Sequence, residues 1–188
     1  MAARRAFLRW LGAVPVLPAV MPGAGRAATA DSGRGHVRLE DEALGLQFDD
    51  TMRCRVVRKA GARTRALTRF DASAWIATKG RRIERFALAS AIPGSCETPF
   101  GPGRCLALVG RSGDGIEKQV TVTLLADFPG TALLDVAYVN HGASPLDVLA
   151  SSSVSHRLLP APRHAGGYWS YSGATHHDRR DWVQPVVR

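Results

Sequence analysis

The sequence has few aromatic residues and lacks a long, uninterrupted apolar run. Phe, Trp and Tyr make up 7% of the 188 residues. They are not interleaved with basic residues, so the chain offers no platform on which nucleic-acid bases could stack. An apolar stretch near the N-terminus, Leu11–Val20, is interrupted by Pro15 and Pro18 and is too short to cross a bilayer. We therefore expect neither a nucleic-acid partner nor a membrane span.

The sequence also lacks a sustained apolar repeat of 3.6 residues, so it predicts no long helix. It shows no internal repeat. Glutamate is scarce, and none of the glutamates lies in a recognisable catalytic context; they are Glu40, Glu42, Glu84, Glu97 and Glu117. The first two absences argue against a helical or a repeat architecture, and the third disfavours a mutarotase-like enzyme, whose chemistry usually needs a Glu and a His in a cleft.

The N-terminus reads as an export signal. Arg4-Arg5 followed by Phe7-Leu8 resembles a twin-arginine motif, and Ala28-Thr29-Ala30 supplies the small residues that a signal peptidase requires. We expect residues 1–30 to be a twin-arginine signal peptide, cleaved before Asp31, and the mature protein to be periplasmic or secreted.

The formal net charge of +9 falls to +5 without residues 1–30, because these contain four arginines and no acid. The remaining basic residues are scattered, several of them on the outward phase of expected strands; examples are Arg53, Arg55, Arg58, Lys59, Arg63, Arg65, Arg69, Arg81 and Arg82. We interpret them as a solvated polar face rather than a binding groove.

Three cysteines leave at least one unpaired in an exported protein. Cys96 and Cys105 flank a short Gly/Pro loop, residues 97–104, and could form a disulfide. Proteins on the twin-arginine route fold in a reducing compartment, so this pairing stays open. Cys54 alternates with Met52 and Val56 and is interpreted as a buried apolar residue.

The clearest strands lie between residues 117 and 148. Val120, Val122 and Leu124 alternate with polar residues, which is the period of a half-buried strand. Asp127–Gly130 then predicts a turn, and residues 133–139 alternate again. A break at Ser144-Pro145 precedes residues 146–150, so we predict three adjacent strands in a meander.

Further short strands are expected upstream, at residues 37–40, 44–48, 52–56 and 105–109, with an apolar run at residues 86–88 that ends by Pro93-Gly94. Short strands spaced by Gly and Pro indicate an all-β sandwich. We assign residues 31–165 to one such domain.

The C-terminal stretch resembles a known family. Residues 167–174, GYWSYSGA, and 179–186, RRDWVQPV, resemble the junction segment of bacterial secreted α-galactosidases of the melibiase type. The 117–146 region is similar to that family in Glu117-Lys118, Asp127–Gly130, Asn140–Gly142 and Pro145-Leu146.

The resemblance implies a galactose-mutarotase-like β-sandwich, or supersandwich, of antiparallel strands, followed by residues 166–188 as a junction towards a (β/α)₈ catalytic barrel. The retaining mechanism of this family uses two barrel aspartates, and a barrel needs on the order of 200 residues. We therefore expect the chain to be the non-catalytic sandwich portion, with no catalytic residues and no cofactor of its own. Its implied partners are an α-galactoside, through the parent enzyme, and the barrel.

The candidate site residues at this junction are Tyr168, Trp169, Arg179, Asp181 and Trp182. Aromatic rings can stack on galactose, and Arg or Asp can bind its hydroxyl groups. The same residues could instead pack the sandwich against a barrel, which we favour.

Two other clusters carry chemically capable residues. His176-His177-Asp178 with Asp181 could suggest a metal site, but adjacent side chains on an extended chain point apart, so no metal is expected. Ser151–Ser153 with His156 and Asp147 lacks the sharp Gly-x-Ser-x-Gly turn of a hydrolase nucleophile and is interpreted as a polar strand edge. Two alternative functions stay open: a free-standing sugar-binding module and a mutarotase-like enzyme.

Overall fold

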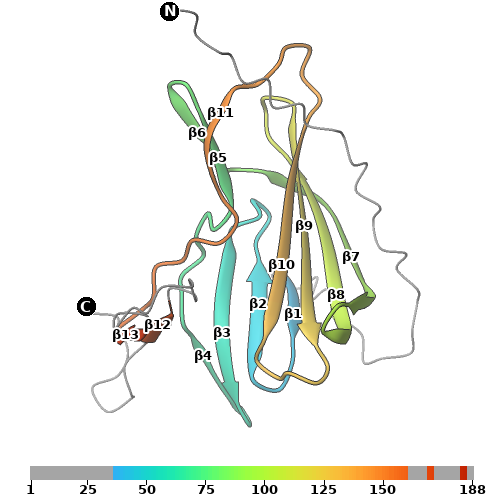
Figure 1. Ribbon diagram of the computed structural model, residues 1–188, viewed down its shortest axis with the longest axis vertical. Helices are drawn as coiled ribbons and strands as arrows, with labels where there is room; N and C mark the ends of the chain where they lie inside the picture. Colours follow the sequence, from blue (N-terminus) through green and yellow to red (C-terminus); the bar gives the residue numbers. More distant parts are fainter. Residues whose placement is uncertain (1–35, 161–168, 172–182, 186–188) are drawn as a thin grey trace, which may run out of the picture.

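Strands and turns make up the described part of the chain, which contains no helix (Figure 1). The computed structural model describes residues 36–160, 169–171 and 183–185. The predicted signal peptide, residues 1–30, and most of the predicted junction, residues 166–188, lie outside these described residues. None of the described residues belongs to a helix that could cross a membrane.

Two four-stranded antiparallel sheets form the body of the fold. The first has the order β1-β2-β3-β4, with β1 Val37–Glu40, β2 Leu44–Phe48, β3 Cys54–Ala60 and β4 Arg63–Ala66. The second has the order β10-β9-β8-β7, with β7 Ala87–Thr98, β8 Gly101–Arg111, β9 Ile116–Leu125 and β10 Ala132–Asn140. A third antiparallel sheet, β11-β5-β6, consists of β5 Trp75–Thr78, β6 Arg81–Ile83 and β11 Val148–Ser152, and β12 Trp169–Tyr171 pairs with β13 Val183–Pro185.

The core lies where the apolar faces of the two larger sheets meet. It includes alternate residues of both sheets: Leu39, Leu46 and Phe48 from the first, and Leu106, Leu108, Val120, Val122 and Leu124 from the second. The predicted alternation of Val120, Val122 and Leu124 is confirmed, because each is buried. Each such side chain contributes about 1.5–3 kcal/mol to folding, so the packed faces define a sandwich-like all-β architecture.

The predicted three-strand meander is wrong in its last member. The strand β11 pairs with β5 in the third sheet and not with β10. The side chain of Asn140 explains where the chain leaves the sheet: its Nδ2 donates to the carbonyl oxygen of Ser144 (2.8 Å) and its Oδ1 accepts from the amide of Gly142 (2.9 Å). These bonds fold residues 140–144 into a loop, and Figure 1 shows the chain rising from β10 towards β5.

The predicted end of a strand at Pro93-Gly94 is also wrong. These residues lie inside β7, where Pro93 is opposite Leu106 of β8. Because β7 is the edge strand of its sheet, only one of its sides needs ladder hydrogen bonds, and an edge strand tolerates a proline that has no N–H to donate.

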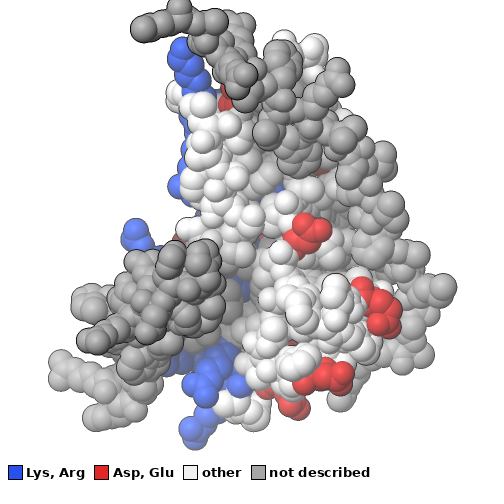
Figure 2. Space-filling view, viewed as in Figure 1, with Lys and Arg blue, Asp and Glu red and all other residues white. Residues whose placement is uncertain are grey.

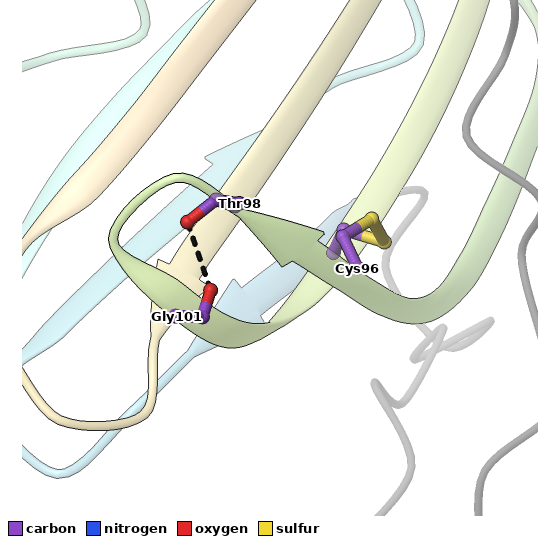
Figure 3. The surroundings of a disulfide bond; sticks show 4 residues. Cys96, Thr98 and Gly101 are labelled. Atoms are coloured by element: carbon purple, nitrogen blue, oxygen red, sulfur yellow. Dashed lines mark hydrogen bonds between the residues drawn. A yellow bond between two sulfur atoms is a disulfide. The ribbon is translucent and has the colours of Figure 1, made fainter.

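The predicted loop at residues 97–104 is shorter than expected. The hairpin between β7 and β8 turns at Pro99-Phe100, with Gly101 at φ 103°, a backbone angle that favours glycine. The hydroxyl of Thr98 donates to the carbonyl oxygen of Gly101 (2.8 Å) across this turn (Figure 3). Next to it, the structure joins Cys96 of β7 to Cys105 of β8 by a disulfide, and Cys54 is free and buried, as predicted.

Candidate functional site

The junction segment forms a short antiparallel hairpin in its described residues. Trp169 of β12 lies opposite Pro185 of β13, and Tyr171 lies opposite Val183. The hairpin therefore brings together the two stretches that resemble the α-galactosidase junction, although 11 residues separate them in the chain. Of the predicted site residues, Tyr168, Arg179, Asp181 and Trp182 lie outside the described residues, as do His176, His177 and Asp178.

The chain leaves the sandwich along the residues that follow β4. The amide of Leu159 donates to the carbonyl oxygen of Leu67 (2.7 Å), and Leu158 bridges to Thr68. The amide of Arg157 donates to Asp71 Oδ2 (3.3 Å). Hydrogen bonds thus attach the segment before residue 161 to the residues that follow β4.

Apolar side chains on this route face solvent. Val148, Leu149 and Val154 are 51%, 68% and 55% exposed, and Leu158 is 39% exposed. They belong to β11 and to the segment that leads towards β12. Exposed apolar residues that gather in one segment are typical of a surface that another protein part covers.

Ser151 and Ser152 lie in β11, the edge strand of the third sheet. The hydroxyl of Ser152 donates a hydrogen bond to the backbone carbonyl of Ser73 (3.4 Å). The hydroxyl proton therefore has a structural partner. Burial lowers the pKa of His156, an effect that the nearby carboxylate of Asp71 opposes. These contacts agree with a polar strand edge.

A polar cluster that the sequence did not predict surrounds Glu117 on β9. Its side chain is 12% exposed, its Oε1 accepts from Gln119 Nε2 (2.9 Å), and its Oε2 lies 3.3 Å from Arg111 Nε and 3.6 Å from His141 Nε2. The hydrogen bond from Gln119, followed by the bond from Arg111 and the charges of His141 and Arg111, lowers the pKa of Glu117 against the opposing effect of burial.

The register of the strand pairs explains why these side chains meet. Val139 lies opposite Glu117, so His141, two residues further along, leaves the same face of the hairpin and reaches back to Glu117. Arg111 of β8 is opposite Glu117 on the other side. Both carboxylate oxygens of Glu117 are engaged, and its lowered pKa keeps it ionised, so it is a weak base and has no proton to donate at neutral pH. The cluster has the chemistry of an ion-pair network.

A second unpredicted group is the buried side chain of Lys118, which is 1% exposed. Its Nζ donates to the carbonyl oxygens of Ala74 (3.3 Å) and Met52 (3.5 Å) and lies 4.9 Å from the centre of the Phe86 ring. Burial lowers the pKa of Lys118 to about 8, although the neighbouring side chains of Cys54 and Asp49 oppose this shift.

The loop that accepts this lysine is unusual in its backbone. Met52 has φ 55°, in the left-handed region that non-glycine residues rarely adopt. The carboxylate of Asp49 stabilises the loop: Oδ1 accepts from the amides of Thr51 and Arg53 (both 2.9 Å), and Oδ2 accepts from Arg53 Nε (2.7 Å). The hydrogen bond from Lys118 therefore joins the second sheet to a strained loop of the first.

Neither Lys118 nor Cys54 has the exposure of a nucleophile. Burial raises the pKa of the Cys54 thiol to about 12, which keeps it protonated. Among the described residues, no three His, Cys, Asp or Glu side chains gather closely enough to hold a metal ion.

The sequence matches no protein-family model and no curated protein. Its function is therefore argued from its own residues and from the resemblance of its junction segment.

Proposed function

We propose that this chain is the non-catalytic β-sandwich of an exported α-galactosidase-like glycoside hydrolase, in which it braces the catalytic barrel and borders the sugar pocket. The observation that supports this function best is the hairpin of β12 and β13. Trp169–Tyr171 and Val183–Pro185, which carry the resemblance, pair as a single structural element after the sandwich.

The exposed apolar residues of β11 and the exit segment also support an accessory role. Val148, Leu149 and Val154 lie next to the route towards the junction. A barrel packed at this side would remove their side chains from water, at about 25 cal/mol per Å² of apolar area buried. The proposal includes the galactose-mutarotase-like supersandwich as the finer fold, with which the antiparallel sheets are compatible.

A mutarotase-like enzyme is the less well supported alternative. Such chemistry needs a base and an acid that converge on an open cleft, and Glu117 and His141 do approach within 3.6 Å. However, the other contacts of Glu117 occupy both of its oxygens, and its pKa is lowered. A base with a strongly stabilised anion removes protons poorly at neutral pH.

Export by the twin-arginine route is part of the proposal. The disulfide between Cys96 and Cys105 is compatible with an oxidising compartment. Replacing Arg4→Lys and Arg5→Lys should leave unprocessed protein in the cytoplasm, which fractionation and an immunoblot would detect. Undiminished mature protein outside the cytoplasm would contradict this route.

The accessory role predicts that the purified protein releases no nitrophenol from a nitrophenyl α-galactoside. Retaining hydrolysis needs a carboxylate nucleophile and a carboxylic acid close together, which the proposal assigns to the barrel. The assay should be run beside the variant Asp181→Ala. Turnover that disappears in this variant would show that the sandwich itself is an enzyme.

Binding of galactose would test the sugar-binding alternative. Trp169→Ala and Trp182→Ala should affect any galactose-induced change in tryptophan fluorescence, whereas Trp75→Phe, in β5 beneath Arg82, serves as the control. A strong affinity lost only in the junction variants would favour a free-standing module over the accessory role.

A further inference from the structure

The hairpin of β3 and β4 is the most basic part of the described chain. Residues 51–70 contain no Asp or Glu, and their basic residues are Arg53, Arg55, Arg58, Lys59, Arg63, Arg65 and Arg69. Figure 2 shows Lys and Arg along the left side of the view, including the lower left where Figure 1 places this hairpin, and Asp and Glu mostly in the right half. The charges are thus segregated on the visible face.

Some of these basic residues are engaged by the sandwich itself. Arg53 forms an ion pair with Asp49 (2.7 Å), and Lys59 forms one with Glu40 (3.2 Å). Arg55 donates a hydrogen bond to Gln47 (2.9 Å) and lies over the Phe70 ring, 4.4 Å from its centroid. These contacts give Arg53, Arg55 and Lys59 a role in stabilising the fold. They do not involve Arg58, Arg63 or Arg65.

These three arginines share one face of the hairpin, and we name them the arginine face. Arg58 lies directly opposite Arg65 in the strand register, and Arg63 precedes Arg65 by two residues, so all three side chains leave the same side of the sheet. Like charges directly opposite each other destabilise a strand pair. The contact of Arg65 Nη2 with the backbone carbonyl of Pro160 (3.1 Å) does not neutralise its charge.

Arg58 and Arg63 are exposed, and no carboxylate in the described ranges forms an ion pair with either. The tip between them is Ala60-Gly61-Ala62, which is exposed and bears no bulky side chain. The guanidinium groups are therefore accessible. A local repulsion with no compensating contact within the fold is typical of a functional surface.

We propose that the arginine face binds an acidic polysaccharide, through the repeated carboxylates or sulfates of the polymer. Guanidinium groups bind such oxyanions through two parallel hydrogen bonds. Strands β3 and β4, CRVVRKA and RTRA, contain no aromatic residue for base stacking, which disfavours nucleic acid. The small residues of the tip provide no large apolar side chain to insert into a membrane.

This binding goes beyond the proposed accessory function and does not depend on it, because it uses other residues and another class of ligand. Calorimetric titration with polygalacturonate at several salt concentrations tests it. The test variant is Arg58→Gln with Arg63→Gln. The control is Lys79→Gln with Arg85→Gln, which removes the same charge from two exposed residues outside the hairpin.

We expect the test variant to bind at least tenfold more weakly than the wild type at low salt. The slope of log affinity against log salt should fall by roughly 1.5, because each neutralised charge contributes about 0.7–0.9 to such slopes in nucleic-acid complexes. The control should bind within twofold of the wild type. Arg58→Lys with Arg63→Lys keeps the charge and should retain most of the affinity.

Thermal unfolding separates loss of binding from loss of folding. Removing Arg58 relieves its repulsion with Arg65, so the Tm of the test variant should equal or exceed that of the wild type. Equal weakening in the test and control variants would overturn the proposal, as would no binding at 50 mM salt. Tighter binding of single-stranded oligothymidylate than of polygalacturonate would assign the face to nucleic acid instead.

Discussion

At the residue scale, the most unusual feature is the side chain of Lys118, which places an ammonium group inside the protein. Isolated charges in an apolar interior are costly, and proteins usually pair them or shift their pKa. Here the compensation comes from two backbone carbonyls and the face of Phe86 rather than from a carboxylate. One of these carbonyls belongs to Met52, so the lysine also holds a loop with a strained backbone.

The lowered pKa of Lys118 predicts a pH dependence of stability. The pKa of a lysine in the unfolded chain is near 10.5, and burial lowers that of Lys118 to about 8. Between these values the unfolded state still binds a proton that the folded state has released, so the free energy of unfolding rises with pH. We expect a gain of about 1 kcal/mol between pH 7 and pH 9 relative to Lys118→Met.

Urea denaturation at several pH values checks this prediction. The comparison stays below pH 9 because burial raises the pKa of Cys54 to about 12 and that of Tyr138 well above its usual range, and both effects reduce stability at higher pH. Lys79→Met, at an exposed lysine, should retain the wild-type profile. Parallel profiles for the wild type and Lys118→Met would contradict the assignment.

At the scale of elements, β8 approaches the loop between β2 and β3 so closely that a side chain at Gly110 would displace the side chain of Met52. A Cβ at Gly110 would overlap Met52 Sδ and lie 3.1 Å from the Cβ of Phe86. Met52 is buried, and hydrogen bonds from Lys118 and to Asp49 hold the backbone of its loop, so its side chain would have to repack within the core to make room. The contact therefore joins the two large sheets at one point.

We expect Gly110→Ala to destabilise the protein by about 1–3 kcal/mol, the usual cost of overpacking. The matched control is Gly113→Ala in the turn between β8 and β9, where an added Cβ meets no atom within 4 Å; it should change stability by less than about 0.5 kcal/mol. Chemical denaturation measures both. Similar losses in the two variants would show that the close contact is not the cause.

Apolar alternation predicted the strands that line the core. β1, β2, β8, β9 and β10 each place apolar residues on the buried phase, and this period is visible in the sequence. The strands β4 and β6, RTRA and RRI, escaped prediction because they are edge strands rich in arginine and show little alternation.

Pairing partners were harder to predict than strands. Nothing in residues 146–150 indicates that β11 pairs with β5. A short apolar strand could add equally well to the free edge of β10 or to that of β5. Pro93 can lie inside β7 because β7 is an edge strand, and only the order of the strands in the sheet reveals this. For the same reason Glu117 and His141 were not predicted to meet, because their contact depends on the hairpin register.

At the scale of the whole molecule, the two large sheets form a sandwich whose exit segment carries exposed apolar residues towards the junction hairpin. Val148 and Leu149 on β11 are followed along the chain by Val154 and Leu158. The pairing of β12 with β13 then joins the two segments that resemble the α-galactosidase junction. Together these features favour a part that works beside a second domain.

The most direct test of this accessory role is the DNA that follows the codon for Arg188, translated in all three frames. The account predicts on the order of 200 or more codons with alternating strand and helix patterns and two aspartates at strand ends, as a (β/α)₈ barrel of a retaining glycosidase requires. A downstream region without any barrel-like coding sequence would contradict the accessory role and favour a free-standing β-sandwich.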